Sequence, residues 1–179
     1  MEQRHYELHP LETGYIDLLH VWRNDASVRG AMINDREISL DEHRRYFGDV
    51  FDKPEFRYLV FFVDGEPNGV VYFSNIDWKR KRSHWGFYLN PARYGRGWGS
   101  AMCFLGLEYG FESLGLEIVD AEVFDWNKAS IRVHESLGFR KTEQNRTIER
   151  NGMSETLLAY ECRRSFWRGE KAAVRGKLL

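Results

Sequence analysis

The sequence predicts an α+β domain with a mixed, mostly antiparallel sheet of about seven strands and about four helices. The middle of the chain alternates apolar runs with turn signals, which is typical of an antiparallel meander. The second half alternates strands with helices and then returns as two strands around Asn151-Gly152, the strongest short hairpin signal. From 179 residues we expect one domain over residues 1–163 and a basic tail over residues 164–179.

The N-terminal third is predicted to form one strand and two helices. The strand covers Tyr6 to Leu11, and a helix follows over residues 16–22. Ser39 is a good N-cap for the second helix, because Glu42 stands three residues further on, as in a capping box.

The meander is predicted as three strands, Arg57–Val63, Gly69–Ile76 and Ser83–Leu89. The turn residues Asp64-Gly65 end the first of them, and a polar, basic tip separates the second from the third. The remaining order is helix, strand, helix and two strands, over residues 102–111, 118–124, 127–138, 139–148 and 153–162.

Composition excludes several classes of protein. There are 26 Lys and Arg residues against 27 Asp and Glu residues, so bulk nucleic-acid binding is not expected. Two cysteines are too few for a disulfide scaffold or a zinc site. The longest apolar run is far shorter than the ~20 residues of a membrane span, and the N-terminus has no signal-peptide pattern. We therefore expect a cytoplasmic protein with no metal, nucleic-acid or membrane partner.

A glycine-rich stretch is the first candidate site. Gly95, Gly97 and Gly99 alternate between a predicted strand and a predicted helix. Backbone amides at a helix N-terminus suit a pyrophosphate, and Arg96 would add a positive charge. The alternative is a tight turn without a ligand. A P-loop is excluded, because no Lys-Ser/Thr follows, and the preceding meander fits a Rossmann fingerprint poorly.

A short helix is the second candidate site. Asn127 is its expected N-cap, and Gly138 suits a left-handed C-terminal position. His134 lies seven residues after Asn127, so both side chains project from similar faces of the helix. Taken alone, this pattern indicates no more than a short capped helix.

The two candidates together resemble a known superfamily. The order strand, Gly-rich turn, helix, strand, Asn127-x-Ala-Ser130, helix and Leu-Gly-Phe139 is similar to the GNAT superfamily of acyl-CoA N-acyltransferases. Its turn pattern is Arg/Gln-x-x-Gly-x-Gly/Ala, in which this chain has both glycines, Gly97 and Gly99, but Tyr94 at the first position.

The resemblance implies a cofactor and a site for it. Acetyl-CoA would lie in a cleft where two central parallel strands splay apart, and an amine would attack its thioester without an acyl-enzyme. The pantetheine would pair with the strand that ends near Leu89 and would contact Asn127 and Ser130. The pyrophosphate would bind the backbone amides of Arg96, Gly97, Trp98, Gly99 and Ser100.

Such a reaction needs two proton transfers. The amine must lose a proton before it attacks, and the departing thiolate gains from a proton donor. The superfamily usually has a Tyr donor where this chain has His134, and an imidazole would serve the same role. Glu122 and His84 are the candidate bases, and an apolar cleft would raise the pKa of the Glu122 carboxyl. The alternatives are a structural histidine and two solvent-facing strand residues.

The N-terminal half resembles the nucleotide-sugar N-acetyltransferases of pseudaminic acid synthesis. The matching pattern is Arg-Asn, then Met, then Ile-Ser-Leu-x-x-His-x-x-Tyr-Phe. Those enzymes acetylate the 4-amino group of a UDP-linked amino-dideoxy sugar. The resemblance implies that UDP would be held by Arg23, Met32, His43 and Tyr46, with Ser74 and Asn75 nearby.

Two other functions stay open. A polyamine or protein N-terminal acetyltransferase also begins with two helices of this length, although the mixed charges of residues 23–45 lack the acidic bias that a polyamine site needs. A protein that binds acyl-CoA as a sensor, without turnover, is the alternative of another class. The expected small-molecule partner is the amino-sugar nucleotide, and a homodimer is left open.

Overall fold

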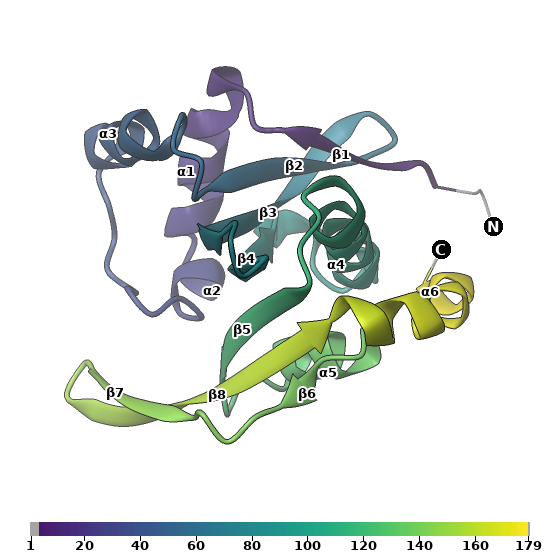
Figure 1. The fold of residues 1–179 in the computed structure, drawn as a ribbon. Coiled ribbons are helices and arrows are strands. Elements are labelled where there is room, and N and C mark those ends of the chain that lie inside the picture. The colour runs from purple at the N-terminus through teal and green to yellow at the C-terminus, as the bar shows by residue number, and fades with distance from the viewer. Residues whose placement is uncertain (1–3, 179) are drawn as a thin grey trace.

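The computed structural model describes residues 4–178, which contain one eight-stranded mixed sheet in the order β1-β2-β3-β4-β5-β8-β6, with β7 paired to β8. Figure 1 shows the N-terminal strands in one half and β5, β7 and β8 in the other. The strands are β1 (Tyr6–Pro10), β2 (Arg57–Val63), β3 (Glu66–Asp77), β4 (Arg82–Leu89), β5 (Ile118–Phe124), β6 (Arg140–Lys141), β7 (Arg146–Arg150) and β8 (Met153–Arg163).

Six α-helices accompany the sheet within residues 4–178: α1 (Ile16–Asn24), α2 (Ala26–Arg29), α3 (Leu40–Val50), α4 (Trp98–Glu108), α5 (Lys128–Ser136) and α6 (Arg164–Leu178). Short 3-10 turns cover Thr13–Tyr15 and Pro91–Arg93, and a π-helical turn at Tyr109–Ser113 extends α4. None of the described helices is long and apolar enough to cross a bilayer.

The predicted meander is confirmed. Strands β1 to β4 pair antiparallel with their sequence neighbours. Asp64 and Gly65 join β2 to β3 with positive φ angles of 52° and 81°. The Asn151-Gly152 hairpin is confirmed in the same way, with φ angles of 52° and 74°, which suit a type I′ turn.

The parallel pair β4–β5 is short, and this positions the site. It runs only from Arg82 opposite Ile118 to His84 opposite Asp120. Beyond His84, β4 pairs only with β3, whereas β5 pairs only with β8. The two central strands therefore splay apart, as the resemblance implied.

The sheet has a core on each face. Alternate residues of β2 separate into the two cores: Val60 and Phe62 pack with α1 and α3, whereas Leu59 and Phe61 pack with α4. This alternation is the period of two that a strand buried on both faces requires.

The strand count differs from the seven that the sequence predicts. Residues 139–148, expected as one strand, form the separate strands β6 and β7. Between Lys141, opposite Tyr160, and Arg146, opposite Leu157, the chain has two residues more than β8. The Asn145 side chain accepts the Ala159 N–H at 2.9 Å and so satisfies a donor of β8 where the ladder is interrupted.

The segment expected as a basic tail is helix α6. Trp167 is fully buried, and its ring lies 5.0 Å from that of Phe104 and 6.1 Å from that of Phe111. Lys171 forms an ion pair with Glu108 at 2.6 Å. The basic residues of this segment thus lie beside an apolar stripe that packs on α4 (Figure 1).

Candidate functional site

A cavity of about 870 Å³ opens where β4 and β5 separate. Its walls come from α1, α2 and the loop after them, from β3, β4 and β5, and from the start of α5. This volume is within the usual range for small-molecule and cofactor sites. The splayed strands therefore create a site large enough for an elongated ligand.

The cavity brings together most of the side chains that the sequence singled out. They come from six separate segments, and they are Arg23, Met32, Ser74, Asn75, His84, Leu89, Gly99, Glu122, Asn127, Ser130 and His134. The remaining predicted residues, Arg96, Gly97, Trp98, Ser100, His43 and Tyr46, are not part of its lining.

The prediction for His43 and Tyr46 is not supported by their positions on α3. The buried His43 ring packs edge-on against Phe47 at 4.9 Å and beside His20 at 5.3 Å. Burial lowers the pKa of His43 to about 4. The Tyr46 hydroxyl instead shares a hydrogen bond of 2.7 Å with the Tyr58 hydroxyl. Both side chains belong to the packing of α3 on β2.

The glycine-rich turn has the backbone shape that an anion site needs. Gly95 and Gly97 have φ angles of +79° and +77°, and Gly97 begins α4 without a side-chain cap. The first amides of α4 are therefore left for a ligand, at the positive end of the helix dipole. The Arg96 guanidinium stacks on the Trp98 ring at 5.4 Å. A pyrophosphate fits this turn.

His134 is buried at the cavity wall with both ring nitrogens engaged. It is 3% exposed. The Trp85 indole can only donate and a carbonyl can only accept, so Nε2 accepts from Trp85 Nε1 at 3.2 Å and Nδ1 donates to the Ser130 carbonyl at 2.8 Å. Burial lowers the pKa of His134 to about 4. The ring is thus neutral at pH 7, and its one proton is held by Ser130.

Glu122 faces the cavity from β5, and its pKa is shifted in the direction opposite to the expected one. We expected an apolar cleft to raise it. Instead, Arg146 donates two hydrogen bonds to the carboxylate, at 2.6 and 2.8 Å. This pair, with a smaller contribution from His84, lowers the pKa of Glu122. At neutral pH Glu122 is a paired carboxylate, which is a weaker base than the one we expected.

Sequence reasoning missed the aromatic lining of the cavity. Tyr72, Trp85, Phe87 and Tyr88 come from the antiparallel pair β3–β4. Tyr72 lies directly opposite Gly86, and a Cβ at position 86 would lie 2.2 Å from the Tyr72 hydroxyl. The phenol therefore occupies the space that any side chain at position 86 would need. A glycine opposite an aromatic residue across the predicted hairpin was the available signal.

The charges of the cavity wall favour anions. Arg23 is half-buried, its Nη2 donates to the Asn34 carbonyl, and its buried Nη1 has no hydrogen-bond partner. Glu122 is the one carboxylate among the described lining residues, and Arg146 already neutralises it. An unpartnered buried guanidinium N–H is costly unless a ligand satisfies it.

Comparison with known proteins gives a family match over most of the chain. The family described as acetyltransferase (GNAT) domain matches residues 6–140. An uncharacterized prophage-derived N-acetyltransferase of Bacillus subtilis, YokL, is 34% identical over 113 residues, which are 62% of each chain. The acetyltransferase PseH of Campylobacter jejuni is 26% identical over 72% of this chain and 79% of its own.

Relatives that act on a polyamine are as similar. The spermidine N(1)-acetyltransferase of Escherichia coli is 29% identical over 74% of this chain and 72% of its own. Among solved structures, the spermidine N-acetyltransferase of Vibrio cholerae, in complex with CoA and spermine, has a TM-score of 0.85 at 19% identity. That match covers 91% of this chain and 98% of the Vibrio chain, and it concerns the fold.

Proposed function

Because the chain belongs to the GNAT acetyltransferase family, we propose that it transfers the acetyl group of acetyl-CoA to a primary amine in the cavity between β4 and β5. In this proposal the pyrophosphate of CoA binds the amides of residues 96–100 at the start of α4. The pantetheine follows the end of β4 at Leu89 and contacts Asn127 and Ser130 on the opposite wall. The thioester then lies where the two strands separate.

The proposed acceptor is an amino sugar linked to a nucleotide diphosphate, and Arg23 is the observation that carries this choice. Its buried Nη1 is without a partner on a wall that has one neutralised carboxylate. A diphosphate would accept charge-assisted hydrogen bonds from this guanidinium, whereas an ammonium would be repelled by it. The similarity to PseH supports the same choice.

A polyamine is the second candidate acceptor, and the spermidine acetyltransferases among the relatives favour it. A polyamine would bring at least two positive charges to a cavity where Arg23 lies on one wall and the one carboxylate is paired. We therefore rank it below the nucleotide-linked sugar. A protein N-terminus, or acyl-CoA binding without turnover, is an outcome that the experiment below separates.

The proposed chemistry is direct attack of the amine on the thioester. Cys103 and Cys162 are buried and do not line the cavity, so the described cysteines offer no acyl-enzyme. His84 is exposed on the wall beside Glu122, and imidazole is the usual group for proton transfer at neutral pH. We propose that His84 and Glu122 accept the ammonium proton, directly or through water. His134 then orients Trp85 instead of donating a proton.

The test measures release of free CoA with three amines: a UDP-linked 4-amino-dideoxy sugar, the same amino sugar without the nucleotide, and spermidine. Arg23→Ala is expected to raise the KM for the UDP-linked sugar by about 10–100-fold, because a charge-assisted contact contributes about 1.5–3 kcal/mol. The KM for acetyl-CoA should stay nearly unchanged. Arg44→Ala is the control, because Arg44 pairs with Asp17 at the surface and does not line the cavity.

Each outcome separates the alternatives. Spermidine as the better substrate would contradict the anionic acceptor while leaving acetyl transfer intact. Acetyl-CoA binding in calorimetry without CoA release, for any of the three amines or for a peptide with a free N-terminus, would favour a binding protein over an enzyme.

A further inference from the structure

The loop between α2 and α3 forms one wall of the cavity without regular secondary structure. We call residues 30–38 the acceptor loop, because Ala31, Met32, Ile33 and Asn34 line the cavity on the acceptor side. A segment of this kind needs partners for its backbone groups. Its carbonyl groups therefore show what holds it in place.

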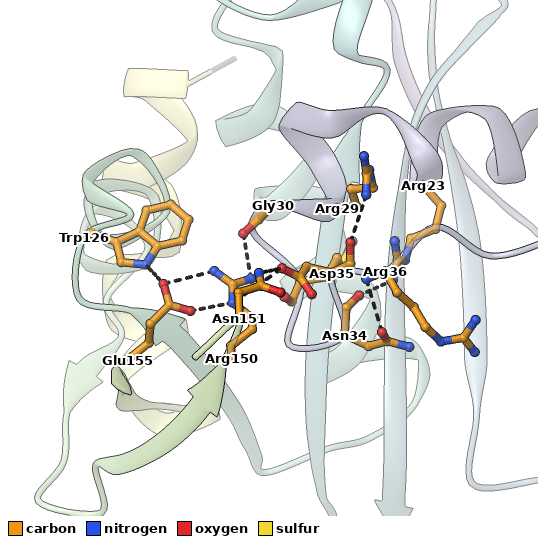
Figure 2. Close-up of polar contacts among 11 residues, drawn as sticks. Arg23, Arg29, Gly30, Asn34, Asp35, Arg36, Trp126, Arg150, Asn151 and Glu155 are labelled. Carbon is orange, nitrogen blue, oxygen red and sulfur yellow. Dashed lines mark hydrogen bonds and ion pairs between the residues drawn. The ribbon is translucent and has the colours of Figure 1, made fainter. Parts of the chain in front are cut away.

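Three arginines donate to carbonyl oxygens of the acceptor loop (Figure 2). Arg23 donates to Asn34 and Arg29 donates to Asp35, and both come from the adjacent helices α1 and α2. Arg150 donates from one nitrogen, Nη1, to the carbonyls of Gly30 and Met32, at 2.8 Å each. Arg150 is the one of the three that comes from the other half of the split sheet.

The guanidinium of Arg150 is itself held firmly at the end of β7. Its Nε and Nη2 donate to the two carboxylate oxygens of Glu155, and its plane lies over the Phe124 ring at 4.4 Å. Trp126 donates to Glu155 at 3.0 Å and so fixes the carboxylate (Figure 2). The Arg150 side chain is 11% exposed. A planar fork with fixed directions suits this set of acceptors, whereas a lysine would offer a single charge.

Next to Arg150, Asn151 makes a second contact with the loop through the Asp35 carboxylate. The β7–β8 hairpin thus reaches across the gap that β4 and β5 leave open. Without these contacts, the acceptor loop would be tied only to its own half of the molecule.

We propose that Arg150 is a positioning residue that fixes the acceptor loop across the split sheet and thereby sets the acceptor site. The residue touches neither the cofactor turn nor the proposed bases. Its contacts hold the backbone at Gly30 and Met32, next to the loop residues that line the cavity. The inference rests on the proposed function only in assigning this wall to the acceptor.

The test compares Arg150→Met, Arg150→Lys and the control Arg163→Met. Arg163 is a surface arginine near the end of β8 that pairs with Glu161. Hydrogen exchange of peptides covering residues 30–38 should rise in Arg150→Met and rise less in Arg150→Lys, with residues 57–63 of β2 unchanged in all three variants. Exchange that stays at the wild-type rate in Arg150→Met overturns the inference, whatever the acceptor is.

The kinetic readout separates positioning from general destabilisation. With whichever of the UDP-linked amino sugar and spermidine the wild type acetylates, Arg150→Met should raise the acceptor KM about ten-fold or more, with the KM for acetyl-CoA within about two-fold. Parallel loss of both affinities and of thermal stability would mean a merely structural role and would contradict the inference. If neither amine is acetylated, the proposed function fails, and the exchange result still decides the role of Arg150.

Discussion

His134 should make folding stability depend on pH in a way that a non-titrating residue removes. Its pKa is about 4 in the folded protein, against the ordinary value of 6.5. Between these values the unfolded chain binds more protons than the folded one, so stability falls as pH falls. At pH 5, this difference amounts to about 2 kcal/mol relative to pH 7.5.

The change to test is His134→Gln. A glutamine amide oxygen can accept the Trp85 N–H, which a phenylalanine would leave without a partner in the core. The variant is expected to be less stable than the wild type at pH 7.5, and the gap should shrink by about 2 kcal/mol at pH 5. His43 titrates in the same direction, but it is present in both proteins and cancels in the comparison.

The assay is urea unfolding followed by far-ultraviolet circular dichroism at pH 7.5 and pH 5. Equal losses of stability in wild type and variant would refute the reasoning, because His134 would then keep an ordinary pKa in the folded state. A protonated imidazole that donates to the thiolate would in that case again be the better assignment. A gap that closes on acidification supports a neutral His134.

Three further predictions concern the cofactor turn, the bases and α6. Gly97→Glu should abolish acetyl-CoA binding in calorimetry, whereas Gly65→Glu, at an equally left-handed turn far along the sheet, should not. His84→Phe should lower kcat more than Glu122→Gln, because Arg146 already lowers the basicity of the carboxylate; the reverse order would make Glu122 the main base. Trp167→Ala should cost about 3–5 kcal/mol in thermal or urea unfolding, and a near-zero effect would show that α6 is dispensable for the core.

Local rules predicted the elements that depend on near neighbours. Ser39 accepts the Glu42 N–H at 3.2 Å, and Asn127 accepts the Ser130 N–H at 3.1 Å, as their cap positions predict. Gly138 has a φ angle of +87° at the end of α5. Each of these features involves residues at most a few positions apart, so the sequence pattern contains the whole interaction.

Features that depend on distant residues were not predictable in this way. The basic composition of residues 164–179 concealed the apolar stripe that packs Trp167 on α4, and no local pattern reveals that partner. The contact of Arg150 with Gly30 joins residues 120 positions apart. The shift in the pKa of Glu122 likewise depends on Arg146, which only the pairing of β5, β8 and β7 brings near.

The most direct test of the proposed function is the ratio of kcat/KM for the UDP-linked 4-amino sugar to kcat/KM for spermidine, measured by CoA release and confirmed by mass spectrometry of the acetylated product. A cavity with an unpartnered Arg23 and a neutralised Glu122 predicts a ratio well above one in wild type and a fall of about 10–100-fold in Arg23→Ala. A ratio below one in wild type, or one that Arg23→Ala leaves unchanged, would contradict the account.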